Sequence, residues 1–144
     1  MNSRPICPLS SDPNDLSALT PGHFLTMEPL SASPEETLLD VPHNRLNRWQ
    51  LLNKLHQQIW ERWSKEYLQT LHQRAKWNSP SPNVQLGTLV VIRQNNIPPL
   101  QWPLGRIIEV HPGSDGIVRV ATVKTNSGIY KRSIVKLCPL PFEP

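Results

Sequence analysis

The sequence has few of the residues that fix a fold through covalent or metal cross-links. Only two cysteines occur among its 144 residues, Cys7 and Cys138, near opposite ends and outside any Cys-X-X-Cys pair. This count excludes a disulfide framework and a zinc knuckle. No apolar run approaches the ~20 residues that cross a bilayer, and the first residues lack the apolar core of a signal peptide. We therefore expect a soluble, intracellular chain.

Catalytic motifs are also missing. The sequence contains no GxSxG elbow, no P-loop and no HExxH helix. Asp12 and Asp15 could superficially bind a metal, but their Pro/Ser-rich context favours turn capping. His56 and His72 would stand roughly 24 Å apart on one helix, too far to share an ion. We expect no catalytic residues, no metal, no cofactor and no small-molecule substrate.

Positive charge is almost absent from the first third of the chain. Residues 1–44 contain Arg4 as their only basic residue against six acids, a net charge of −5, whereas residues 45–144 hold 14 basic and 5 acidic residues, a net charge of +9. Such asymmetry favours a module that binds a polyanion, joined to a segment with another role. A merely solvated basic surface is the alternative.

The acidic N-terminal segment is rich in proline. Residues 1–44 carry seven of the 16 prolines, which predicts an extended, largely irregular segment. Asp12 can cap a turn opened by Pro13, and Thr20 before Pro21 predicts a short helical start. The segment is either the end of a larger domain or a disordered arm.

Residues 45–77 contain neither proline nor glycine and predict one long amphipathic helix, with Asn44 as its cap. Apolar residues recur every three or four positions along one stripe: Trp49, Leu52, Leu55, Ile59, Trp63, Tyr67 and Leu71. Leu51, Trp60 and Leu68 widen this stripe. The opposite face is polar and basic: Arg48, Lys54, Arg62, Lys65, Gln69, Gln73 and Lys76.

Such a helix would be roughly 50 Å long, which exceeds what one small domain can cover. The preceding polar, Pro-rich segment is also expected to leave the stripe open. We therefore expect one half of it to pack against a partner, through Trp49, Leu52, Leu55 and Ile59. The tryptophans of the helix are expected to be core or interface residues rather than ligand contacts.

After a linker at 78–83, residues 84–140 alternate apolar and polar positions in about five short runs. Asp115-Gly116 is a strong hairpin signal, and Asn126-Ser127-Gly128 marks a second tight turn. A short helical turn is expected before the last strand. The pattern predicts a small five-stranded SH3-like β-barrel, with an OB-like barrel as the second choice, and so an α+β chain overall.

The predicted barrel carries seven basic residues and two acids, a net charge of +5. Basic side chains bind phosphates largely without sequence preference. The candidate DNA-binding residues are Arg93, Arg106, Arg119, Lys124, Lys131, Arg132 and Lys136. Arg119, Lys124, Lys131 and Arg132 flank one hairpin and form the favoured cluster, with Arg119 expected to point away from a buried apolar face that holds Val118 and Val120.

Two aromatic residues of the barrel could stack on a base or sugar, Trp102 and Tyr130. Trp102 is more simply explained as a cover for one end of the barrel. A different class of function stays open, because SH3-like and chromo-like modules also bind proteins, including methylated lysines, through aromatic cages. A continuous basic face would favour DNA, and a pocket shared by Trp102 and Tyr130 would favour a protein partner.

Several short sequence motifs resemble those in the Pol polyprotein of BEL/Pao retrotransposons. They are NSRP at 2–5, TPGHFL at 20–25, PLGRIIEV at 103–110 and SDGIVRVATVKT at 114–125, together with the RW…IWERW…EYL pattern of the helix. Residues 2–30 resemble the segment after the integrase catalytic core, 46–77 its connecting helix, and 87–140 its C-terminal domain of unknown function. The resemblance covers nearly the entire chain.

The resemblance implies a noncatalytic C-terminal part of an integrase, because the family's catalytic acids lie upstream of NSRP. It implies non-specific DNA binding by the small barrel and support of integrase assembly during DNA integration. The implied partners are DNA and the integrase core or another integrase protomer, without a membrane. The implied location is the nucleus or a cytoplasmic virus-like particle, and Met1 is expected to be an internal residue of the parent polyprotein.

Overall fold

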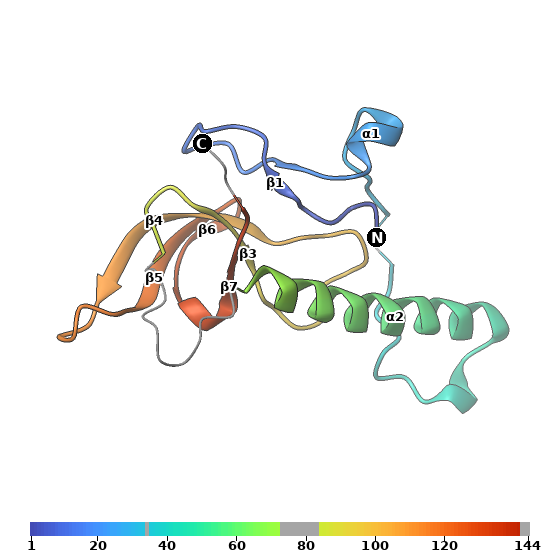
Figure 1. Ribbon diagram of the computed structural model, residues 1–144. Helices are drawn as coiled ribbons and strands as arrows, with labels where there is room; N and C mark the ends of the chain where they lie inside the picture. The colour runs from blue at the N-terminus through green and yellow to red at the C-terminus, as the bar shows by residue number, and fades with distance from the viewer. Residues whose placement is uncertain (34, 73–83, 142–144) are drawn as a thin grey trace.

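The computed structural model describes residues 1–33, 35–72 and 84–141 (Figure 1). The fold is α+β, with one long helix and a five-stranded antiparallel sheet. The main elements are α2 (Arg48–Leu71), β3 (Leu89–Ile92), β4 (Leu104–Pro112), β5 (Val118–Thr125), β6 (Gly128–Ser133) and β7 (Leu137–Pro139). Shorter elements are β1 (Cys7–Pro8), β2 (Ala18–Leu19), α1 (His23–Thr26), η1 (His43–Arg45) and η2 (Ile134–Lys136).

The sheet has the strand order β6-β5-β4-β3-β7, and every neighbouring pair is antiparallel. The five predicted strands and the helical turn before the last one, η2, are confirmed. The predicted closed barrel is not formed: in the described part of the chain, β6 and β7 stand at the two ends of the row without pairing. The link between them is η2, whose 3-10 turn interrupts the strand hydrogen bonding at that point.

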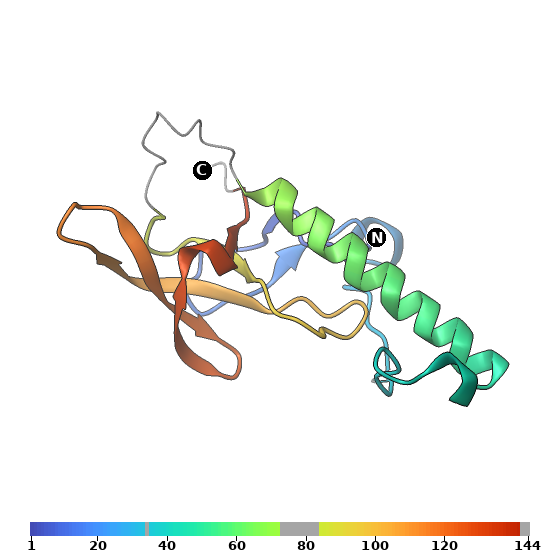
Figure 2. The ribbon, with the colours of Figure 1, turned by 90° about the horizontal axis from the view of Figure 1, so that it is seen from below.

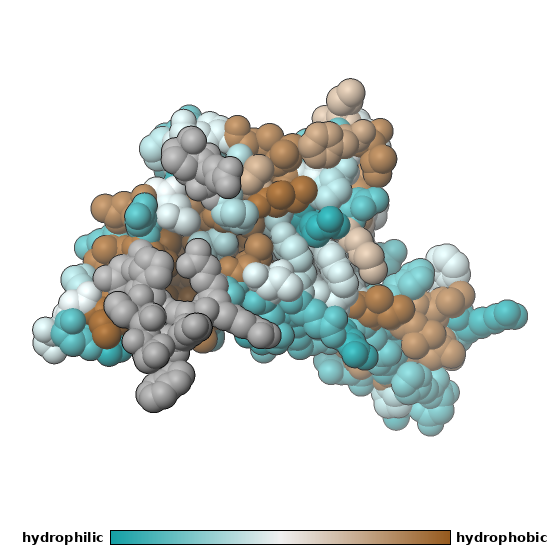
Figure 3. Space-filling view, viewed as in Figure 1, coloured by the Kyte–Doolittle hydropathy of each residue, from teal (hydrophilic) through white to brown (hydrophobic). Residues whose placement is uncertain are grey.

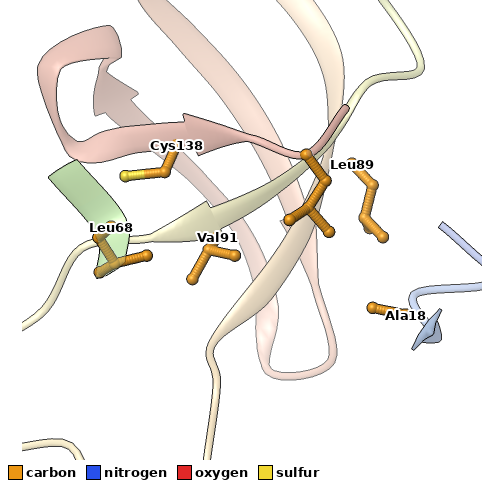
Figure 4. Packing of buried hydrophobic residues seen from close by; sticks show 6 residues of the cluster. Ala18, Leu68, Leu89, Val91 and Cys138 are labelled. Atoms are coloured by element: carbon orange, nitrogen blue, oxygen red, sulfur yellow. The ribbon is translucent and has the colours of Figure 1, made fainter. Parts of the chain in front are cut away.

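Strand β3 is buried on both of its faces. Val90 and Ile92 contribute to one core, together with Ile107, Ala121, Val123 and Leu137. Leu89 and Val91 point the other way, toward Ala18, Leu68, Cys138 and Leu140 (Figure 4). Side chains alternate across a strand, so this uninterrupted apolar run of four residues requires two cores.

Four aromatic residues join α2 to the sheet. Trp60, Trp63 and Tyr67 recur at helical spacing, and Trp102 reaches them from the loop before β4, with ring centroids between 5.2 and 5.9 Å apart. Trp60 is buried, and Trp102 also donates from Nε1 to Ser3 Oγ at 3.3 Å. Trp60 and Trp63 are thus packed within the molecule, as expected for these two tryptophans. Trp102 also has a structural role, but it packs against α2 instead of covering the end of a barrel.

Helix α2 begins later than expected. Its N-cap is Asn47 rather than Asn44, because the Asn47 side chain accepts from the Gln50 N–H while the Gln50 side chain accepts from the Asn47 N–H. This reciprocal capping box satisfies two otherwise unpaired donors. The helix ends at Leu71, and the expected continuation over 73–77 lies outside the described residues.

Two polar residues in the first half of α2 are buried, which the sequence pattern did not predict. Lys54 is buried and donates to the Val41 carbonyl at 2.6 Å. Gln57 is buried as well, accepting from the Leu38 N–H at 2.9 Å and donating to the Glu36 carbonyl at 2.8 Å. These polar groups satisfy backbone groups of the preceding segment, so the covered side of α2 combines them with Trp60 and Leu68.

The N-terminal segment packs on the rest of the molecule instead of forming a free arm. Strand β1 pairs with β2, the Gly22 N–H donates to the Asn2 carbonyl at 2.7 Å, and the Tyr67 hydroxyl donates to the Pro5 carbonyl. The expected helix start at Thr20 is displaced, because α1 has Gly22 as its N-cap. Among the described residues, no helix combines the length and apolarity that a membrane span requires.

Candidate nucleic-acid interface

The predicted basic cluster lies on the β5–β6 hairpin, whose geometry comes from its turn. Gly128 takes a φ of 137°, which favours glycine, and directly opposes Thr125 across the two turn residues. Thr125 Oγ1 donates to the Gly128 carbonyl at 2.9 Å, and the Tyr130 hydroxyl donates to the Ser127 carbonyl at 3.1 Å. These bonds order the hairpin tip and hold the Tyr130 ring beside it.

Lys124 and Lys131 share one face of this hairpin. Lys131 opposes Thr122, and Thr122 and Lys124 are two positions apart on β5, so their side chains leave the same side. Lys131 is exposed. Lys124 is half-buried and donates to Asn14 Oδ1 at 2.7 Å, a contact across 110 residues of sequence.

Arg132 and Tyr130 leave the opposite face, since each is adjacent in sequence to Lys131. The Arg132 guanidinium lies over the Tyr130 ring, 5.3 Å from its centroid. Both side chains line an open hollow of about 360 Å³ that Gln94, Thr125, Asn126 and Ser127 also border. Three of the four predicted hairpin cations, Lys124, Lys131 and Arg132, are therefore divided between two faces instead of gathered on one.

Arg119 stands apart at the far end of β5, where it is paired. Its guanidinium donates to both carboxylate oxygens of Asp115, at 3.1 and 2.6 Å. The Arg119 hydrogen bonds lower the pKa of Asp115 to about 2, with a further contribution from the Ile117 N–H.

The expected alternation of buried and exposed side chains along β5 is interrupted near Arg119, where the pairing with β4 shifts register between His111 and Pro112. Val118 is buried but Val120 is 37% exposed, so the supposed apolar face is not continuous.

The backbones of Arg93 and Lys136 are joined at the end of β3. The Arg93 N–H donates to the Lys136 carbonyl at 2.7 Å, which joins the end of β3 to η2. Lys136 is exposed and Arg93 is half-buried.

Arg106 is wrongly placed among the phosphate-binding candidates. It is 5% exposed, and its guanidinium donates to the carbonyls of Gly87 at 2.8 Å, Asp15 at 2.7 Å and Ser10 at 3.2 Å. The side chain fixes the N-terminal segment to the sheet, so it is not available to a ligand. Counting charges along the sequence could not reveal this, because both carbonyls of the segment lie more than 90 residues away.

Trp102 and Tyr130 do not border the same hollow. Tyr130 lies beside the hairpin tip, whereas Trp102 packs against the aromatic residues of α2. Tyr130 remains 38% exposed and available for stacking. The cavity bordered by Trp60 and Trp102 measures only about 20 Å³, which is too small for a methylated ammonium group.

Asp12 and Asp15 confirm the turn-capping interpretation. Asp12 Oδ1 accepts from the Asn14 N–H and Asp15 Oδ1 from the Ser17 N–H, each at 2.8 Å. Hydrogen bonds from Ser17 lower the pKa of Asp15. Within residues 1–33, 35–72 and 84–141, no three His, Cys, Asp or Glu side chains come together as a set that could hold a metal.

The four predicted interface residues of α2 are all exposed. Their exposed fractions are 70% for Trp49, 45% for Leu52, 44% for Leu55 and 62% for Ile59. Hydrophobic side chains gather over the half of α2 that lies away from the sheet (Figure 3). Their exposure agrees with the expectation for the single chain, and their packing against a partner stays a prediction.

The architecture defines a small α+β module, a long helix packed at one end on an open antiparallel sheet. The chain belongs to the Family of unknown function (DUF5641), whose model matches residues 47–140, from the N-cap of α2 to the end of β7. No curated protein and no solved structure matches the chain.

Proposed function

We propose that the chain is a noncatalytic DNA-binding and assembly module that contacts duplex DNA through the β5–β6 hairpin. The observation that carries this proposal is the arrangement of its cations. Lys131 and Lys124 stand on one face of the hairpin, and Arg132 lies beside an exposed tyrosine on the other. Because both faces of the hairpin carry cations, either face can bind DNA phosphates when the hairpin lies along a groove.

The order of the strands supports an SH3-like assignment for residues 84–140. The first strand, β3, lies between β4 and β7, and a 3-10 turn precedes the last strand. An SH3-like barrel has this connectivity, and β-barrels of this size are common nucleic-acid-binding modules.

We propose little sequence preference. The candidate contacts are long, flexible side chains on an exposed strand pair, which suit phosphates better than base edges. The described helix that contacts β5 is η2, a 3-10 turn of three residues, which is too short to act as a recognition helix in a groove. Tyr130 adds a stacking surface, which is tolerant of sequence because every base has an aromatic face.

The arrangement of the aromatic residues does not favour the alternative of a methyl-lysine or peptide reader. A cage needs several aromatic rings around an open space. Here Trp60, Trp63 and Tyr67 pack directly on Trp102, so the rings fill the space themselves.

A charge reversal tests the hairpin. Replacing Lys131 and Arg132 together with glutamate should weaken binding to duplexes of unrelated sequence by about 10- to 100-fold, equally for all of them. Fluorescence anisotropy at low salt measures the affinities. A matched control uses single variants. Lys131→Glu is compared with Arg45→Glu, which makes the same change of charge at an exposed residue just before α2.

Equal losses for Lys131→Glu and Arg45→Glu would assign binding to overall charge and contradict a hairpin site. A loss confined to one DNA sequence would contradict the non-specific mode.

We also propose that the chain neither cuts nor joins DNA. With Mg²⁺ or Mn²⁺, a labelled duplex should remain intact, because Asp12 and Asp15 are engaged with backbone N–H groups rather than turned toward a common site. Gel analysis of the labelled strands measures this. Metal-dependent cleavage that disappears in Asp12→Asn or Asp15→Asn would overturn it.

The resemblance to BEL/Pao integrases supplies the proposed context. In that context the chain acts after an RNase-H-like core, in the nucleus or in a cytoplasmic virus-like particle, and its α2 face meets the core or another protomer. Sequencing the transcript through Met1 tests the origin. A reading frame for an RNase-H-like core upstream would support it, and an unrelated or untranslated upstream sequence would contradict it.

A further inference from the structure

One row of exposed residues on α2 has a regular spacing. Starting at residue 48 and stepping by four and three residues alternately, the row is Arg48, Leu52, Leu55, Ile59, Arg62 and Glu66. We call this row the 48–66 seam. Steps of four and three place all six side chains on one helix face, as in the a and d positions of a coiled coil. The expectation that Arg48 and Arg62 lie opposite Leu52, Leu55 and Ile59 is therefore wrong, because the spacing puts them on the same face.

Every residue of the seam is exposed, including the three aliphatic ones. The covered side of α2 is a different one, marked by Lys54, Gln57, Trp60 and Leu68. The half of α2 that carries most of the seam extends beyond the sheet in both ribbon views (Figures 1 and 2). A second helix can therefore reach the seam without displacing another described segment.

The seam complements itself when one copy is reversed. Turned about a two-fold axis at the height of residue 57, Leu55 opposes Ile59 of a second copy, and Ile59 opposes Leu55. Arg48 then opposes Glu66 of the second copy at each end. Opposite charges thus flank a central apolar layer on both sides, as isologous contacts require.

The remaining layer also fits this register. Leu52 opposes Arg62 of the second copy, whose aliphatic stem can lie along the leucine while its guanidinium stays near Glu66, the ion pair that the single chain already has at 3.1 Å. Trp49 comes alongside Trp63 of the second copy, which would cover a ring that is 70% exposed in one chain.

We propose that α2 pairs antiparallel with α2 of a second copy of this chain through the 48–66 seam. A parallel pair would place Arg48 against Arg48, Arg62 against Arg62 and Glu66 against Glu66, so repulsion disfavours it. The inference deepens the assembly part of the proposed function by naming the partner, and it is independent of whether the hairpin binds DNA.

The contact is small for a stable dimer, which usually buries about 800 Å² on each partner. We therefore expect a reversible dimer with a dissociation constant on the order of 10–100 µM. Sedimentation velocity of the full chain at rising concentration should show one chain's mass at the lowest concentrations and approach two chains' mass at the highest.

Two single charge reversals give a specific test. Arg48→Glu places glutamate against Glu66 at both ends of the pair, and Glu66→Arg places arginine against Arg48, so each variant alone should dimerise at least about 10-fold more weakly. An equal mixture of the two should recover dimers, because each end of the mixed pair then joins opposite charges. Circular dichroism confirms that each variant is folded.

Arg45→Glu and Lys131→Glu are the controls, since both lie outside the seam and should leave the dissociation constant unchanged. A wild-type chain that stays monomeric at several hundred micromolar contradicts the proposal. So does a mixture that associates no better than its components. DNA binding is measured separately by anisotropy, so a monomer that still binds DNA overturns this inference alone.

Discussion

Replacing Arg106 with alanine should lower the free energy of unfolding by about 2–4 kcal/mol, because the substitution removes a buried charged donor from three backbone carbonyls. Two of these, Ser10 and Asp15, belong to the N-terminal segment, and the third, Gly87, precedes β3. The loss should therefore release residues near Asp15 from the sheet as well as reduce overall stability. Urea unfolding followed by circular dichroism measures the free energy.

Lys136→Ala is the matched control, because it removes an equal charge from an exposed position and should change stability by less than about 0.5 kcal/mol. Hydrogen exchange gives a local readout. Faster exchange of the Ile6 and Leu9 amides, which bond to Leu19 and Ser17, is expected in Arg106→Ala. If the two variants were equally stable, Arg106 would be a surface cation and would return to the set of possible phosphate contacts.

Replacing Trp102 with alanine should cost about 3–5 kcal/mol, the usual range for removing a large aromatic side chain from a packed site. Its ring touches Trp60, Trp63 and Tyr67 of α2, and its indole N–H reaches Ser3. The substitution therefore loosens the junction of helix, sheet and N-terminal segment together. Thermal unfolding monitored by tryptophan fluorescence and by circular dichroism measures the effect.

Tyr130→Ala provides the comparison for Trp102. Tyr130 is exposed, so its removal should leave stability within about 1 kcal/mol of wild type while weakening DNA binding by a few-fold. For Trp102→Phe, which keeps an aromatic ring in the core, DNA affinity should stay close to wild type. Normal stability with lost DNA binding in Trp102→Ala would show that this residue stacks on nucleic acid.

The sheet was predictable because its signals are local. Asp115-Gly116 and the Asn126–Gly128 turn fix two hairpins. Alternation of apolar residues was a weaker guide, because all four residues of β3 are buried whereas Val120 of β5 is exposed. That the sheet stays open, and does not close into a barrel, was not predictable in the same way. Whether the first and last strands of a small sheet pair with each other depends on distant geometry, here on η2 between β6 and β7.

The helix was recognised, but its buried side was not. Apolar spacing correctly placed Trp60 and Leu68 in the core. It could not show that Lys54 and Gln57 would be buried too, because their partners are backbone groups of residues 36–41. A long side chain with an apolar stem and a polar end can serve either surface, and only the partner decides.

The hairpin that carries the candidate site was predictable, but the set of cations that its surface leaves free was not. Seven cations could be counted from the sequence, yet the structure engages Arg106 with carbonyls, Arg119 with Asp115 and Lys124 with Asn14. Strand alternation could have separated Lys131 from Arg132, since neighbours on a strand face opposite sides. The contact with Asn14 could not have been found, because it joins residues 110 positions apart.

The salt dependence of DNA binding tests the central claim most directly. The affinity of the full chain for a random-sequence duplex is measured by anisotropy at several salt concentrations, for the wild type and for the Lys131→Glu, Arg132→Glu double variant. With three to five phosphate contacts available, a plot of log affinity against log salt should have a slope of about −3 to −4 in the wild type, and a slope shallower by about 1–2 in the variant. A wild-type affinity that does not change with salt, or identical slopes for the two proteins, would contradict a phosphate-binding hairpin.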